Sequence, residues 1–115
     1  MQGALRNAMG AGNHARRLLG RVGLKHLKLS DGTADVAYWT VPAVRGRGVA
    51  PRAVNAMASW AFAAGFHRLD LEHAVANTAS CRVAEKTGFG AEGVRRSAWL
   101  LADGRCDVHA HARLR

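Results

Sequence analysis

Cysteine and proline are both scarce in this chain of 115 residues, which contains two of each. Cys81 and Cys106 are too far apart for a Cys-x-x-Cys motif, and no matching histidine pattern accompanies them. Two cysteines with this spacing do not supply the framework of a small disulfide-rich domain, so we expect both to be reduced thiols. The sequence has no internal repeat, and its length allows one hydrophobic core. We therefore expect a single domain over residues 1–115.

Long hydrophobic runs are also absent. No apolar stretch approaches the roughly 20 residues that a membrane-spanning helix requires. The first twenty residues lack the apolar core of a signal peptide. These absences predict a cytoplasmic protein with no membrane partner. Residues 1–14 are rich in Gly, Ala and Asn without a clear period, which predicts a poorly ordered arm.

Acidic residues are few: 8 Asp and Glu stand against 17 Lys and Arg, for a formal net charge of +9. The excess is spread along the chain, so a solvated basic surface is the simplest interpretation. A nucleic acid or an acidic partner remains the alternative.

The six histidines are scattered along the sequence. His109 and His111 lie two residues apart and share a face if their segment is a strand. This pair lacks the additional ligands that a closed zinc site requires, so we expect no metal.

The hydrophobic pattern predicts a mixed α/β protein with the element order β-β-α-β-α-β-β. Strands are expected at 21–29, 35–41, 67–75, 92–101 and 106–114, and helices at 51–65 and 78–87. Asp-Gly pairs at 31–32 and 103–104 mark the hairpin turns. Gly65 and Gly88 are suited to end the two helices, and Asn77 is suited to cap the second one.

A loop with two glycines, Arg45-Gly46-Arg47-Gly48-Val49-Ala50, lies directly before the first predicted helix. Pro51 suits the first turn of a helix, where no N–H is required. A glycine-containing loop that runs into a helix N-terminus presents unpaired N–H groups and the positive end of the helix dipole. The segment therefore predicts a phosphate-binding site, surrounded by Arg45, Arg47 and Arg52.

Two familiar phosphate-binding motifs do not fit this loop. The dinucleotide fingerprint requires a third glycine where Pro51 stands. A P-loop requires Gly-Lys-Ser/Thr, and neither the lysine nor the hydroxyl is present. An ordinary turn remains the alternative for the loop taken by itself.

The neighbouring motifs favour a third class. They are Ala34–Trp39, Pro42, Arg45–Ala50, Trp60–Phe62, Asn77–Ser80, Val83–Phe89, Glu92-Gly93 and Asp103–Arg105. Together they resemble the GNAT acetyltransferase superfamily over about residues 22–114, and in particular its RimJ/RimL-like branch of ribosomal-protein-alanine N-acetyltransferases. The resemblance implies a mainly antiparallel, twisted sheet with two helices. It also implies acetyl-CoA as co-substrate, bound where the strands at 35–41 and 68–74 diverge.

The resemblance assigns roles to particular residues. The pyrophosphate would bind the N–H groups of Arg45, Gly46, Arg47, Gly48, Val49 and Ala50. The pantetheine arm would pair with the backbone of Trp39, Thr40 and Val41 and contact the Asn77 amide. Capping of the helix is an alternative role for Asn77, and core packing is the alternative for Tyr38 or Trp39.

Ser80 matches the serine that protonates or stabilises the departing CoA thiolate in the resembling branch. Many members use a tyrosine one turn later, but that position is Ala84 here. A serine without a chemical role remains the alternative. No histidine is locally arranged to activate Cys81 as a nucleophile. Asp35, Glu72 and His73 are candidate bases, and none matches a diagnostic motif.

A full GNAT domain begins with a strand and two helices that bind the acceptor, and we expect this chain to lack them. The open sheet edge would then favour a homodimer. The predicted function is transfer of an acetyl group from acetyl-CoA to the amine of a protein N-terminus or a small molecule. The alternative is a catalytically silent basic module that binds acyl-CoA or nucleic acid.

Overall fold

The computed structural model describes residues 20–115, so the arm predicted at 1–14 lies outside the described residues. The described elements follow the predicted order. They are β1 (Gly20–Lys28), β2 (Thr33–Thr40), the 3-10 turn η2 (Pro42–Val44), α2 (Val49–Ala63), β3 (Arg68–Ala74), α3 (Thr78–Lys86), β4 (Gly90–Leu101) and β5 (Gly104–Leu114).

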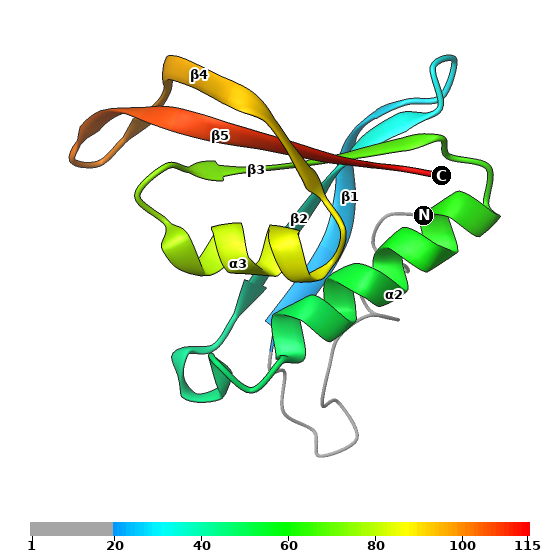
Figure 1. The fold of residues 1–115 in the computed structure, drawn as a ribbon, viewed down its shortest axis with the longest axis horizontal. Helices are drawn as coiled ribbons and strands as arrows, with labels where there is room; N and C mark the ends of the chain where they lie inside the picture. The colour runs from blue at the N-terminus through cyan, green and yellow to red at the C-terminus, as the bar shows by residue number, and fades with distance from the viewer. Residues whose placement is uncertain (1–19) are drawn as a thin grey trace.

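The five strands form one sheet in the order β1-β2-β3-β5-β4 (Figure 1). The β2–β3 pair is parallel, and the other three pairs are antiparallel. A parallel pair needs a long crossover, which α2 provides. The prediction of a mixed, mainly antiparallel sheet is therefore confirmed.

Both hairpins turn at the predicted places, but the second turn is shorter than predicted. Gly32 adopts φ +68° in the β1–β2 turn, where a residue without a Cβ is favoured. In the β4–β5 hairpin, Gly104 already pairs with Leu101. The connection is therefore two residues, and Gly104 and Arg105 belong to β5 rather than to the turn.

Helix α2 begins at Val49, two residues before the predicted start, because Gly48 precedes it in the left-handed conformation with φ +76°. Pro51 still lies in the first turn, where its missing N–H is not needed. At the other end Gly65 has φ +110°, and the Phe66 N–H donates to the Ala61 carbonyl over 3.0 Å. This is a Schellman ending, so the cap itself is Ala64 and Gly65 follows it.

Helix α3 has both ends that its sequence predicts. The Asn77 Oδ1 accepts a hydrogen bond from the Ser80 N–H over 3.1 Å, which caps the N-terminus. Gly88 has φ +79°, and the Phe89 N–H donates to the Ala84 carbonyl over 2.9 Å. The Phe89 side chain folds back into the core, as expected.

One hydrophobic core lies between the sheet and the two helices. Alternate side chains of the inner strands point into it, such as Leu69 and Leu71 of β3, because strand side chains alternate between faces. From the helices it receives Val54, Met57 and Ala84, among others. Both helices therefore cover the same face of the sheet (Figure 1).

The parallel strands β2 and β3 stay together over a short distance. Their register pairs Thr33 with Arg68, Ala34 with Leu69 and Asp35 with Asp70. Beyond Asp35 the strand β2 continues to Thr40 while still pairing with β1 on its other side. The two strands therefore diverge toward their C-terminal ends, as the resemblance predicts.

Candidate functional site

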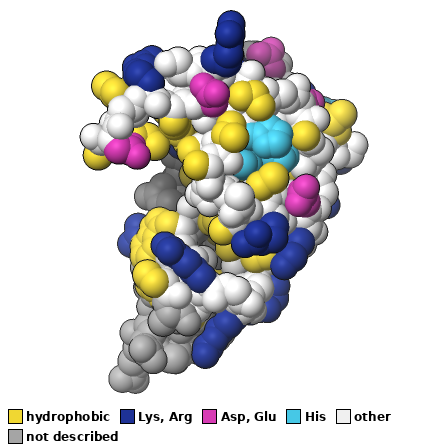
Figure 2. Space-filling view, turned by 60° about the vertical axis from the view of Figure 1, so that its left-hand side comes forward, with side chains coloured by type: hydrophobic (Ala, Val, Ile, Leu, Met, Phe, Trp, Pro, Cys, Tyr) yellow, Lys and Arg dark blue, Asp and Glu magenta, His cyan; other side chains and the backbone are white. Residues whose placement is uncertain are grey.

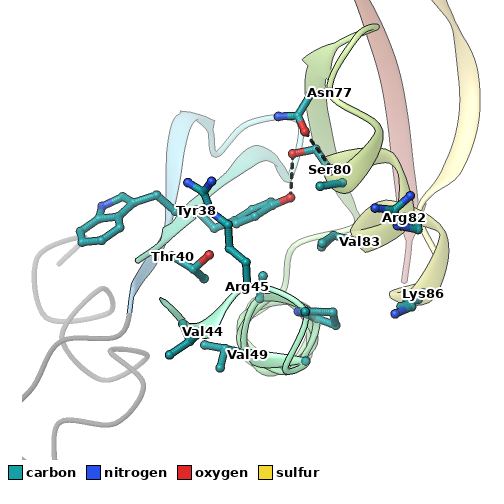
Figure 3. Close-up of a pocket in the computed structure, with 16 residues that line it drawn as sticks. Tyr38, Thr40, Val44, Arg45, Val49, Asn77, Ser80, Arg82, Val83 and Lys86 are labelled. Carbon is teal, nitrogen blue, oxygen red and sulfur yellow. Dashed lines mark hydrogen bonds between the residues drawn. The ribbon is translucent and has the colours of Figure 1, made fainter. Parts of the chain in front are cut away.

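A cavity of about 380 Å³ opens where β2 and β3 diverge, between the start of α2 and one side of α3 (Figure 3). Its lining comes from the end of β2, the following loop and two helices. The described residues around it are Tyr38, Trp39, Thr40, Val44, Arg45, Gly46, Gly48, Val49, Ala50, Pro51, Asn77, Ala79, Ser80, Arg82, Val83 and Lys86. The fold thus brings together segments that are about forty residues apart in the sequence.

The loop before α2 presents several N–H groups at this cavity that have no partner among residues 20–115. The N–H groups of Arg45 and Arg47 close turns onto the carbonyls of Pro42 and Val44, each over 3.2 Å. Within the described residues, the N–H groups of Gly46, Gly48, Val49 and Ala50 have no hydrogen-bond partner. The group that an anion can use is therefore smaller than the six consecutive N–H groups predicted from the sequence.

Glycine is required at Gly46 and Gly48 because both have positive φ angles, +84° and +76°. A Cβ at Gly46 would meet nothing within 4 Å, so that position faces open space. A Cβ at Gly48 would lie 3.1 Å from the guanidinium of Arg52. The glycines therefore shape the loop, and an incoming group can approach its backbone at Gly46.

Two of the predicted cofactor-binding residues, Val41 and Arg47, do not belong to the described lining. Val41 precedes the 3-10 turn as its N-cap, after β2 has ended. The Arg47 carbonyl accepts a hydrogen bond from the Arg52 guanidinium over 3.3 Å. Arg52 is therefore turned to the loop backbone and is also not part of the lining.

The other predicted residues do line the cavity. They are Trp39, Thr40, Arg45, Gly46, Gly48, Val49, Ala50, Asn77 and Ser80. On the side that faces β3, the backbone of Trp39 and Thr40 is beyond the last β2–β3 pair. That edge is available to a ligand that pairs like an added strand. Asn77 uses its oxygen for the cap, which leaves its amide N–H groups for another partner.

Ser80 has a neighbour that the sequence did not reveal as a site residue. The Tyr38 hydroxyl lies 2.9 Å from the Ser80 Oγ, and the close-up shows the pair at the upper side of the cavity (Figure 3). Tyr38 is half-buried and also packs against the core. Burial raises the pKa of Tyr38 above its ordinary value, although the hydrogen bond with Ser80 opposes that rise. The phenol is therefore neutral near pH 7 and can donate a proton to its neighbour.

Positive charge around the cavity comes partly from residues that were not predicted. Arg82 and Lys86 line it from α3, opposite Arg45 (Figure 3). Together with Ala79 and Val83 they form one helix face, with spacings of three and four residues. The spacing can be read from the sequence and predicts a shared helix face. Only the packing of α3 beside the loop shows that this face lines the cavity.

None of the three candidate bases lines the described cavity. The Asp35 carboxylate pairs with His26 over 2.7 Å, and the Glu72 carboxylate pairs with Arg95 over 2.8 Å. His73 is buried beneath α3, where its Nδ1 donates to the Ala74 carbonyl over 2.7 Å. The general base therefore stays unassigned.

Comparison with known proteins identifies the family of this fold and site. The sequence profile of the acetyltransferase (GNAT) domain matches residues 4–90, which is most of the chain. The chain belongs to the GNAT acetyltransferase family. No curated protein sequence matches it at a significant level.

Solved structures agree with the assignment to the GNAT family. A probable GNAT acetyltransferase from Chromobacterium violaceum is 28% identical, with a TM-score of 0.78, over 84% of this chain and 50% of that chain. A RimL ribosomal L7/L12 alpha-N-protein acetyltransferase in complex with coenzyme A is 25% identical, with a TM-score of 0.80. The match covers 83% of this chain and 54% of that chain.

A ribosomal-protein-S5-alanine acetyltransferase from Vibrio fischeri shares the fold, with 22% identity and a TM-score of 0.82. The match covers 88% of this chain and 56% of that chain. This GNAT chain thus spans 56% of the length of the first structures that it matches. None of the helices within residues 20–115 is long and apolar enough to cross a membrane.

Proposed function

We propose that the cavity binds acetyl-CoA and that the chain transfers the acetyl group to an amine. The observation that supports this most is the position of four N–H groups at the N-terminus of α2 that have no partner in the described part of the chain, those of Gly46, Gly48, Val49 and Ala50. These groups suit the pyrophosphate, because the helix dipole and the donors favour an anion at the same place. The RimL relative is described in complex with coenzyme A.

The other residues that line the cavity suggest where the remaining parts of acetyl-CoA would bind. The free edge of Trp39 and Thr40 would pair with the amides of the pantetheine arm, and the Asn77 amide would donate to one of its carbonyls. This path leads from the loop toward Ser80, which lines the same cavity. Arg45, Arg82 and Lys86 would offset the negative charge of the phosphates.

In the chemical step, the neutral amine attacks the thioester carbonyl carbon and forms the new C–N bond. The C–S bond then breaks, and the CoA sulfur leaves as a thiolate. Ser80 donates its hydroxyl proton to that thiolate, and the neutral Tyr38 phenol replaces the proton over their 2.9 Å hydrogen bond. The amine releases a proton to solvent, and the Tyr38 phenolate regains a proton from solvent, which restores the starting state of both side chains.

The acceptor is proposed only as a chemical class. Related structures include enzymes named for a ribosomal-protein alanine and for spermidine, which are chemically different acceptors. What these acceptors share is a primary amine, so this is the class that we assign to the chain.

A charge reversal at the loop tests cofactor binding. Ala50→Glu places a carboxylate among the proposed pyrophosphate donors, so the affinity for acetyl-CoA should fall at least ~10-fold. The fold should be retained, because an acidic side chain in the first turn of a helix is favourable. Ala56→Glu is the matched control, since it makes the same change at an exposed position of the same helix.

Isothermal titration calorimetry with acetyl-CoA measures both variants. Equal affinities for Ala50→Glu and wild type would contradict the proposed site. Release of CoA thiol with a panel of amines then separates an enzyme from a silent binder, and Ser80→Ala should abolish most of that release. Salt-dependent binding to DNA or RNA that ignores acetyl-CoA would instead favour the nucleic-acid alternative.

A further inference from the structure

Four side chains that bind metals in proteins converge beneath α3, outside the lining of the cavity. They are His73 of β3, Cys81 of α3, and His109 and His111 of β5. One potential ligand atom from each lies within 4.8 Å of those of the others. The strand register explains the convergence, because it places His73 opposite His109 and Leu71 opposite His111 on the face that α3 covers.

The three imidazole rings are in mutual contact. Their centroids lie 5.3 Å apart for His73 and His109, 5.0 Å for His73 and His111, and 4.2 Å for His109 and His111. His73 and His111 are almost fully buried, whereas His109 is half-buried. Histidine side chains gather in a patch on the molecular surface in Figure 2. A small ion therefore has access to the cluster from solvent.

Two backbone carbonyls determine which ring nitrogens are available. The Nδ1 of His73 lies 2.7 Å from the Ala74 carbonyl, and the Nδ1 of His111 lies 3.2 Å from the Phe89 carbonyl. A carbonyl oxygen only accepts hydrogen bonds, so each Nδ1 carries the proton. In the neutral rings each Nε2 then presents a lone pair. Backbone carbonyls commonly hold metal-binding histidines in this tautomer.

The two Nε2 atoms lie 3.0 Å apart. Two lone pairs that face each other at this distance repel, unless a cation lies between them or binds both.

We propose that His73, Cys81, His109 and His111 form a zinc site. Three imidazole nitrogens and one thiolate are a ligand set that Zn²⁺ takes in tetrahedral sites with four protein ligands. With Zn–N distances of about 2.05 Å, two imidazole nitrogens on one tetrahedral Zn²⁺ lie about 3.3 Å apart, close to the spacing of the two Nε2 atoms. The absence of oxygen ligands disfavours Mg²⁺ and Ca²⁺. On binding, the Cys81 thiol releases its proton to solvent.

This proposal changes the expectation that His109 and His111 lack further ligands. His73 and Cys81 are brought to them only by the pairing of β3 with β5 and by the position of α3. The effect of the metal would be structural, since four protein ligands leave no open coordination position. It would fix α3 to the sheet at Cys81, directly beside Ser80. Among the described residues of α3, only Ala84 is fully buried, and Val83 packs against the core as a partly buried side chain.

Metal titration of the full chain tests the site without acetyl-CoA or an amine. The reduced, chelator-treated protein should bind about one Zn²⁺ per chain in competition with a chromophoric chelator, and its Tm should rise with Zn²⁺. Co²⁺ in place of Zn²⁺ should give the intense visible bands of a tetrahedral ion and a thiolate-to-cobalt charge-transfer band.

Matched substitutions identify the ligands. Cys81→Ser should remove the charge-transfer band and weaken Zn²⁺ binding at least ~10-fold, whereas Cys106→Ser should do neither. His109→Gln should also weaken binding, and the exposed His67→Gln should not. Circular dichroism of the metal-free variants checks that each is folded. The proposal is overturned if Zn²⁺ does not bind, if the band persists in Cys81→Ser, or if Cys106→Ser removes it equally.

Discussion

At the scale of single residues, the pair of Tyr38 and Ser80 connects packing with the proposed chemistry. Tyr38 extends from the core into the cavity, so its hydroxyl is partly removed from water. An acid in such a place stays protonated to higher pH, because burial disfavours the charged form. The environment of Tyr38 therefore keeps a proton available beside Ser80.

This environment predicts a measurable shift, because Tyr38 is the only tyrosine in the sequence. Tyrosinate absorbance should titrate at a higher pH in the folded protein than in the urea-unfolded chain, where the pKa is about 10. Ser80→Ala should raise the pKa further, since it removes the hydrogen bond that lowers it. A folded-state pKa at or below that of the unfolded chain would contradict the buried Tyr38–Ser80 contact.

The same shift determines the sign of a stability effect. With the folded-state pKa raised, the stabilisation linked to Tyr38 is complete below the unfolded pKa and is lost as the pH rises through the folded pKa. The free energy of unfolding should therefore depend less on pH above about pH 10 in Tyr38→Phe than in wild type. Urea unfolding at a series of alkaline pH values measures this difference.

At the scale of secondary-structure elements, α3 carries residues for two proposed functions on different faces. Ala79, Arg82, Val83 and Lys86 line the cavity, while Cys81 faces the histidines of the sheet. Asn77 caps the helix and also lines the cavity, so its two roles require separate tests.

Two substitutions at Asn77 separate capping from ligand contact. Asn77→Ala removes the cap and should lower the free energy of unfolding by about 1 kcal/mol. Asn77→Ser retains a capping oxygen, so its stability should stay near that of wild type, but it lacks the amide donors. Its affinity for acetyl-CoA should therefore still fall. If Asn77→Ser binds acetyl-CoA like wild type in calorimetry, Asn77 acts only as a cap.

At the scale of the whole molecule, one edge of the described sheet is unusual. Strand β4 lies at that edge, is twelve residues long and is exposed over most of its length. It carries Leu100 and Leu101 as exposed apolar residues near its end. Long, apolar edge strands favour pairing with another chain.

We therefore expect a homodimer that forms through β4 at micromolar concentration. Leu100→Lys should shift the molar mass measured by light scattering toward that of the monomer. Leu29→Lys is the matched control, because Leu29 is equally exposed but lies in the β1–β2 turn. A wild-type monomer at these concentrations would disprove the prediction.

Much of this organisation could be predicted from the sequence. The order of the elements, the Asp-Gly turns, the Asn77 cap and the glycines that end both helices follow from local backbone preferences, which act within a few residues. The prediction of an anion site in the loop from Arg45 to Ala50 rests on the same local preferences. Its position between two characteristic motifs indicated the GNAT family.

Other features depend on contacts between residues that are distant in the sequence. The pairing of Tyr38 with Ser80 requires that β2 and α3 meet across the cavity. The convergence of His73 and Cys81 with His109 and His111 requires the β3–β5 register and the position of α3 on the sheet. Local preferences decide which elements form and where they end. Only tertiary packing decides which side chains of those elements face each other, because that depends on register and on the faces that burial selects.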